Sequence, residues 1–154
     1  MLNPNKIIKL IPTACEWIET QEALILEIGV PLSQKLLEIA SKIGIKDVSK
    51  IRLLSVASVP EPEDAELNKA SKMIGLISSN TLGVAFRYGI YIREDFWDDE
   101  SLIIHELTHT MQYERLGGIS NFMNQYIKEC IIHGYNGSPL EKEARSMEAM
   151  LAVR

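Results

Sequence analysis

The amino-acid sequence predicts a single α+β domain that is mostly helical and contains a small sheet. A chain of 154 residues is long enough for one domain with its own core, and it is short for two. Apolar residues make up 46% and charged residues 24%, as in ordinary globular proteins. Several segments repeat apolar residues at helical spacing, whereas two others have the composition or the alternation of strands.

Two helices are expected first, over residues 14–28 and 32–43. Both segments place apolar side chains three or four positions apart, which is the spacing of one helix face. Gly29 ends the first helix, and Gly44 is a typical C-terminal stop for the second.

A strand and a third helix follow. Residues 51–58 form a short apolar run before Pro60, which favours a buried strand. After an acidic, proline-rich loop, apolar residues from Leu67 to Ile77 share one side of a helix. We expect the polar residues 78–80 to end this helix.

Residues 81–93 alternate apolar with smaller or polar side chains, which is the period of a strand. Gly89 marks a bend or a turn inside this run. The sequence leaves two possibilities open, one long strand or a tight hairpin.

Three helices complete the chain. The first covers residues 100–116, begins after an aspartate-rich segment that supplies N-cap candidates, and ends at Gly117. The others are expected over residues 120–133 and 139–152, with a glycine-rich turn between them.

Composition excludes several classes of protein. The net charge of −5 leaves no basic field for a phosphate backbone, so we expect no nucleic-acid partner. Cys15 and Cys130 lie far apart in sequence, which excludes a disulfide framework. The first residues break their apolar run with proline and glutamate, unlike a signal peptide, and no stretch reaches the roughly 18 apolar residues of a membrane span. We therefore expect a cytoplasmic protein with no membrane partner.

The segment from His105 to His109, HELTH, is an HExxH motif on an expected helix. Residues four apart lie on one helix face, so both imidazoles can supply nitrogen ligands to a single Zn²⁺ ion. Glu106 lies about 100° around the helix from His105, which places its carboxylate beside the metal rather than on it. There it can act as the general base for a zinc-activated water.

A catalytic zinc usually has three protein ligands, so one more is needed. The longer HExxHxxGxxH pattern does not fit, because Gln112 stands at its glycine and Arg115 at its third histidine. The residues themselves leave these downstream candidates open: His133, Glu141, Glu143 and Glu148.

The motif and its surroundings resemble the gluzincin zinc metallopeptidases, in which a glutamate on a later helix completes HExxH. The resemblance covers roughly residues 81–149 and includes Tyr135 ahead of the segment SPLEKEA. The family's Glu-x-x-Ala motif maps onto Glu141 and Ala144, which implies that Glu141 is the third ligand. Many relatives have Asp or Asn after the alanine as a supporting partner. This chain has Arg145, so that support must come from elsewhere.

General chemistry also favours Glu141. A carboxylate in the first turn of a helix faces backbone N–H groups, which can hold it in place while one oxygen binds a metal. We expect Glu143 and Glu148 to be solvated, and His133 to be a surface or capping residue near a helix C-terminus.

The resemblance implies a compact zincin-like domain over residues 1–154 with the HExxH helix at its centre. Residues 1–80 are then a helical N-terminal part with one strand, and residues 81–154 are the metal-binding catalytic core. The implied activity is hydrolysis of peptide bonds in a peptide or protein substrate, with an extended substrate along the strand near residues 84–92.

In this interpretation His105, His109 and Glu141 hold Zn²⁺, and Glu106 is the general base. Tyr135 is a candidate donor to the developing oxyanion. The main rival hypothesis is a non-catalytic zinc-binding regulatory or protein-interaction module on a metalloprotease-like fold, because the chain has little room for a second subdomain. A helical interaction protein without metal is the remaining alternative.

Overall fold

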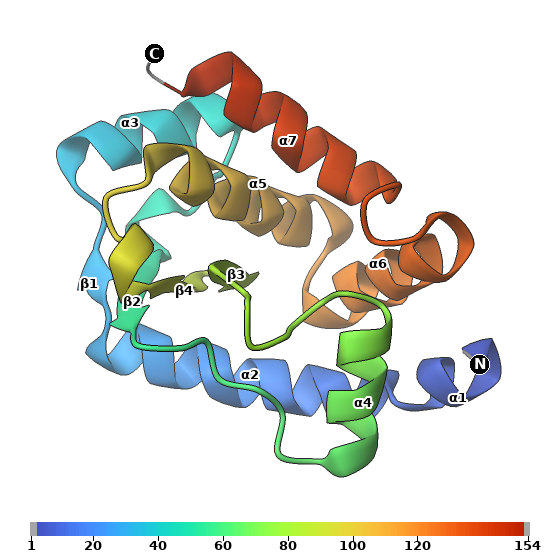
Figure 1. Cartoon of the computed structure of the whole chain (residues 1–154). Coiled ribbons are helices and arrows are strands. Elements are labelled where there is room, and N and C mark those ends of the chain that lie inside the picture. Colours follow the sequence, from blue (N-terminus) through green and yellow to red (C-terminus); the bar gives the residue numbers. More distant parts are fainter. Residues whose placement is uncertain (1–2, 153–154) are drawn as a thin grey trace.

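The computed structural model describes residues 3–152, which form an α+β fold with a small mixed sheet (Figure 1). The ends of the expected domain, residues 1–2 and 153–154, lie outside this range. The helices are α1 (Pro4–Lys9), α2 (Ile11–Ile28), α3 (Gln34–Ile43), α4 (Ala65–Met73), α5 (Glu100–Leu116), α6 (Ile119–His133) and α7 (Pro139–Leu151). The strands are β1 (Val30–Pro31), β2 (Arg52–Val56), β3 (Gly83–Phe86) and β4 (Gly89–Arg93).

The sheet has the strand order β1-β2-β4-β3, so β3 is an edge strand. Strands β2 and β4 are parallel, and the two outer pairings are antiparallel. In the register of the sheet, Ile90 of β4 lies between Leu53 of β2 and Ala85 of β3. The interior position of β4 explains why its side chains are buried on both faces.

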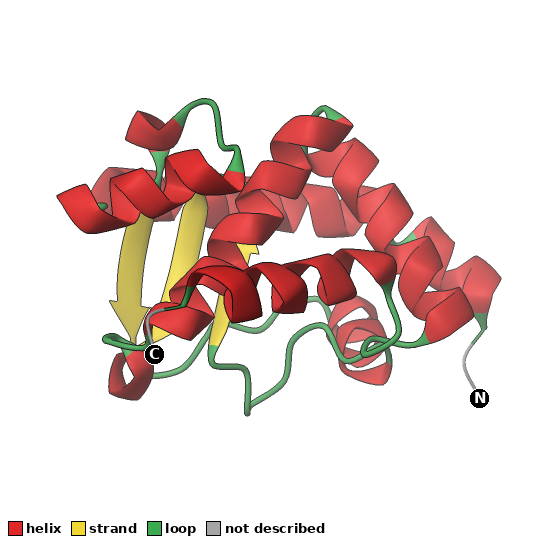
Figure 2. Cartoon of the chain, turned by 90° about the horizontal axis from the view of Figure 1, so that it is seen from above, coloured by secondary structure: helices red, strands yellow, loops and turns green. Residues whose placement is uncertain are grey.

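Two apolar cores lie on opposite faces of this sheet. Ile90 and Ile92 pack with apolar residues of α3 and α5, whereas Tyr91 between them belongs to the core formed with α2 and α6. Helix α2 covers one face and α5 the other, with α7 beyond α5 (Figures 1 and 2). Helix α5 is therefore enclosed between the sheet and α7. None of the helices in residues 3–152 is long and apolar enough to cross a bilayer.

Most of the expected elements are present. The expected helix over residues 100–116 is confirmed with both of its ends, where Asp99 accepts a 3.0 Å hydrogen bond from the Leu102 amide and Gly117 has a left-handed φ of 96°. The strand expected over residues 51–58 is confirmed as β2, and the last two helices are confirmed as α6 and α7.

Other predictions need correction. The helix expected to reach Ile77 ends at Met73, because Gly75 takes a left-handed φ of 79° and stops it a turn earlier. The run over residues 81–93 is a hairpin, and Gly89 is the first residue of β4 rather than the turn. A Cβ at Gly89 would lie 2.9 Å from that of Ile25, so glycine is needed there for α2 to pack directly on β4. Helix α1 and strand β1 were not predicted.

The hairpin turn contains Arg87, which is not glycine and yet has a φ of 60°. Buried Glu22 of α2 accepts two hydrogen bonds from the Arg87 guanidinium, at 2.9 and 2.7 Å, and a third from the Tyr88 amide at 2.9 Å. The Thr110 hydroxyl of α5 donates to the Arg87 carbonyl at 2.5 Å. The turn is thus attached to the helices on both faces of the sheet.

Replacing Glu22 by alanine removes these three hydrogen bonds and leaves a partly buried guanidinium unpaired. We expect the free energy of unfolding to fall by about 2 kcal/mol, measured by urea denaturation. Glu19→Ala is the matched control, since Glu19 is an exposed glutamate of the same helix, and its change is expected within about 0.5 kcal/mol. Equal effects of the two substitutions would show that Glu22 does not hold the hairpin.

Candidate metal centre

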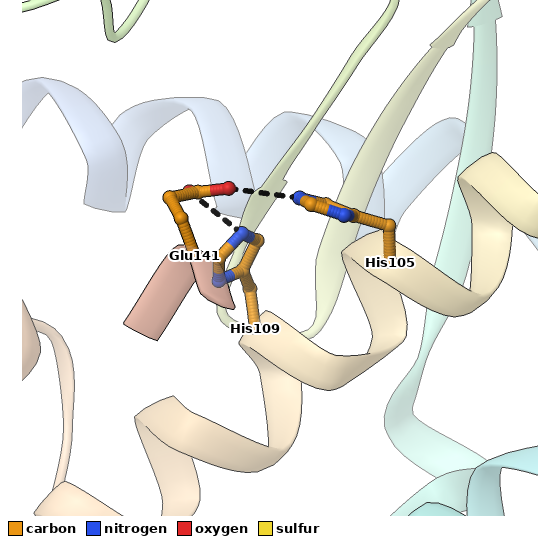
Figure 3. A group of neighbouring side chains, drawn as sticks. All are labelled: His105, His109 and Glu141. Carbon is orange, nitrogen blue, oxygen red and sulfur yellow. Dashed lines mark hydrogen bonds and ion pairs between the residues drawn. The ribbon is translucent and has the colours of Figure 1, made fainter. Parts of the chain in front are cut away.

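Helix α5 positions both histidines of the HExxH motif. Ile103, Ile104 and Leu107 face the sheet and are buried in the core, which fixes the rotation of the helix. His105 and His109 leave the helix on another side, one turn apart, and extend towards Glu141 in the first turn of α7 (Figure 3).

Glu141 lies within hydrogen-bonding distance of both imidazoles. Its Oε1 is 2.9 Å from Nε2 of His105, and its Oε2 is 3.0 Å from Nε2 of His109. Glu141 is 1% exposed and His109 is 7% exposed, so the carboxylate and the second imidazole are almost completely removed from water. Two segments 32 or more residues apart in the chain therefore meet at one buried point.

These three side chains fit a metal ion. Each offers one ligand atom, and the ligand atoms all lie within 4.8 Å of one another. Ligands about 2.0–2.1 Å from a tetrahedral Zn²⁺ are separated by about 3.3 Å, which is close to the 2.9 and 3.0 Å between the Glu141 oxygens and the two Nε2 atoms. Two imidazole nitrogens and one carboxylate oxygen are also a donor set that zinc accepts, and they leave a fourth position for a non-protein ligand.

Each of the three groups is held by a further side chain. Glu148 contacts Nδ1 of His105 at 2.9 Å, and Gln112 contacts Nδ1 of His109 at 2.7 Å. The Tyr126 hydroxyl of α6 donates a 2.6 Å hydrogen bond to Oε2 of Glu141. With Nδ1 engaged in this way, a neutral imidazole directs the lone pair of Nε2 at the central point.

Two of these partners were not predicted. Glu148 was expected to be solvated, but it supplies the support that Arg145 cannot give, because it follows Glu141 by two helical turns on the same face of α7. That spacing is visible in the sequence. Nothing in the sequence connects Tyr126 to Glu141, because they lie on different helices and only the packing of α6 against α7 brings them together.

The alternative third ligands lie elsewhere. Glu143 pairs with Arg115 at 2.8 Å and also accepts a 2.7 Å hydrogen bond from Gln112. His133 is exposed at the end of α6. Of the candidates for the third ligand, Glu141 is the one that converges with the two histidines.

The charges of the centre perturb its titration. Burial lowers the pKa of His105, but its contact with Glu141 and the negative charge of Glu106 outweigh this and raise the pKa to about 9. Burial raises the pKa of Glu141, yet its hydrogen bonds with His105 and His109 dominate and place that pKa far below its usual range. Without a metal, the contacts with Glu141 therefore favour the protonated form of both imidazoles and the ionised form of the carboxylate.

Glu106 and Tyr135 border the space in front of this centre. A cavity of about 420 Å³ is lined by both residues and by His105, with the loop after α4 as its opposite wall. Burial raises the pKa of Glu106, partly offset by the nearby histidines and by a backbone hydrogen bond with Ala85. The two residues predicted to be catalytic therefore line the cavity that adjoins His105.

In comparisons with known proteins, no family model, curated protein sequence or solved structure matches this chain. The chemistry assigned to the centre therefore depends on its geometry and on the motif.

Tyr126→Phe removes the hydroxyl that holds Oε2 of Glu141 and leaves the packed ring in place. We expect the zinc affinity to fall about tenfold, since loss of such a supporting hydrogen bond frees the ligand to rotate. Competition with a chromophoric chelator measures this. Tyr91→Phe is the matched control, because the Tyr91 hydroxyl bonds Gln21 and not the centre. An unchanged affinity for Tyr126→Phe would mean that this hydroxyl does not position Glu141.

The pH dependence of stability should reverse when zinc is added. The pKa of His105 is raised to about 9, so its contribution to the stability of the chelator-treated protein is complete below about 6.5 and is lost as the pH rises towards 9. Zinc requires neutral imidazole, so the increase in Tm caused by zinc should grow across the same interval.

Thermal unfolding near pH 6 and pH 9, with chelator and with zinc, measures both trends. Substituting His105 by Gln should flatten them, whereas His133→Gln should leave them unchanged. A zinc-induced change in Tm that is the same at both pH values would contradict this charge arrangement.

Proposed function

We propose that this protein is a zinc-dependent peptidase with a zincin-like architecture. The observation that carries the proposal is the convergence of His105, His109 and Glu141 next to a cavity that Glu106 also borders. A purely structural zinc site is closed by four protein ligands, whereas three ligands beside an open cavity suit a catalytic one. The packing of the HExxH helix on a mixed sheet, with the carboxylate supplied by a later helix, agrees with the gluzincin resemblance.

In the proposed reaction, a zinc ion held by the three ligands would polarise the scissile carbonyl and activate a water molecule. Glu106 takes one proton from this water as its oxygen bonds to the carbonyl carbon. The same carboxyl group then passes the proton to the amide nitrogen as the C–N bond breaks. Burial raises the pKa of Glu106, which makes its carboxylate a stronger base for taking a proton from water.

Tyr135 is proposed to donate a hydrogen bond to the developing oxyanion. It lines the same cavity as Glu106, and it also lines a smaller cavity beside Glu141. Burial raises the pKa of its phenol, so the group remains a neutral donor at physiological pH.

The substrate is proposed to bind as an added strand at the edge of the sheet. Within the β3–β4 hairpin, β3 lies at an edge of the sheet and β4 in the interior, so the docking segment is Gly83–Phe86 rather than the whole of residues 84–92. A Cβ at Gly83 would lie 3.4 Å from Cγ of Glu106, which places this strand directly beside the proposed base.

Glu106→Gln tests the general-base role. The amide keeps the size of the side chain and leaves the three ligands intact, so the protein should bind zinc as before and lose peptide hydrolysis by at least about 100-fold. Zinc content and cleavage of a peptide library, each with and without chelator, are the measurements. Glu143→Gln is the matched control and should retain both properties.

Hydrolysis by the Glu106→Gln protein at the parent rate would exclude this role. Stoichiometric zinc in the parent protein without cleavage of any peptide would favour the non-catalytic zinc-binding module instead.

A further inference from the structure

The cavity beside the centre carries negative charge that the proposed reaction does not use. We propose that it selects peptides with a lysine or arginine side chain next to the scissile bond. This inference rests on the proposed function and names its substrate class.

Three carboxylates line the cavity: Asp99 at the start of α5, Glu106 on that helix, and Glu148 on α7. Its lining residues within the described chain include no lysine and no arginine. Two cations that are three positions from a lining residue in the sequence, Lys72 and Arg145, are engaged elsewhere. Lys72 pairs with Glu61 at 3.1 Å, and the Arg145 guanidinium donates to the Asn136 carbonyl.

A bound metal does not cancel this charge. The two positive charges of a zinc ion would be balanced by Glu141 and Glu106, which leaves the charges of Asp99 and Glu148 uncompensated. Each of these carboxylates uses one oxygen within the protein, Asp99 towards the Leu102 amide and Glu148 towards His105. The second oxygen of a carboxylate can still accept a hydrogen bond from an ammonium or guanidinium group.

The sizes of the two cavities at the centre direct a long side chain into the larger one, which contains the three carboxylates. The second cavity at the centre, lined by Phe122, Tyr126 and Tyr135, has a volume of about 40 Å³, which is room for about three water molecules. The cavity of about 420 Å³ has apolar walls at Leu76, Leu82 and Leu102. A lysine or arginine can lay its methylene stem along such walls while its charged end reaches a carboxylate.

Asp99→Asn separates this role from the structural role of the residue. Asparagine is as good an N-cap as aspartate, so α5 keeps its cap while the cavity loses a charge. Asp98→Asn is the matched control, because this substitution removes the same net charge. Asp98 is exposed and does not line the cavity.

The test uses the zinc-loaded full chain and peptides that differ only in one residue beside the cleaved bond, as Lys, Gln or Glu. We expect kcat/KM to decrease in the order Lys, Gln, Glu, with about a tenfold preference for Lys over Gln that weakens at high salt. Asp99→Asn should reduce the Lys/Gln ratio about threefold or more, and Asp98→Asn should not. Binding of the same peptides to the zinc-loaded Glu106→Gln protein, followed by fluorescence anisotropy, should show the same order.

The outcomes separate the inference from the proposed function. Cleavage without a preference for Lys, or a preference that Asp99→Asn leaves intact, overturns the inference while the peptidase stands. Binding that prefers Lys, with no cleavage by the parent protein, overturns the peptidase and supports the selectivity of the cavity. Neither binding nor cleavage by zinc-loaded protein overturns both.

Discussion

The carboxylate of Glu141 is almost entirely buried. The need to compensate its negative charge determines how α5, α6 and α7 are arranged. An unpaired buried carboxylate costs several kcal/mol, so it persists only where other groups compensate it. Two imidazoles of α5 and a phenol of α6 do so, each at 3.0 Å or less. Gln112 of α5 then joins His109 to the backbone of α7 through the Leu140 carbonyl. The same side chains that close the core in this region thereby aim two nitrogens and one oxygen at a common point.

The N-terminal half of the chain helps to position the edge strand and the loop that border the metal centre. Thr110 of α5 and Glu22 of α2 both hold the turn of the β3–β4 hairpin. This attachment places the edge strand beside Glu106, one turn of α5 away from Thr110. The loop between α4 and β3 forms the opposite wall of the cavity, so residues outside the gluzincin resemblance contribute to the proposed substrate site.

The sequence predicted the parts of this arrangement that depend on local chemistry. The HExxH spacing, the aspartate cap and glycine stop of α5, and the apolar periodicity of the long helices are local signals, and the structure contains them. The Arg87 turn could not be predicted, since its left-handed conformation is stabilised by Glu22, a residue 65 positions away. The choice of Glu141 over Glu143 and His133 came from the resemblance and from its place in the first turn of a helix, and convergence with the histidines depends on how α7 packs against α5. Glu148 was misjudged because two glutamates seven residues apart on a helix are ordinary surface features unless a histidine faces them.

The central claim is that His105, His109 and Glu141 share one divalent ion. Its most direct measurement is X-ray absorption at the zinc edge of the purified, zinc-loaded protein, combined with metal analysis. The account predicts about one zinc per chain, a shell of nitrogen and oxygen ligands at about 2.0–2.1 Å with the scattering pattern of two imidazoles, and loss of the ion in Glu141→Ala but not in Glu143→Ala. A shell that contains sulfur, or zinc retained with unchanged ligands after Glu141→Ala, would contradict it.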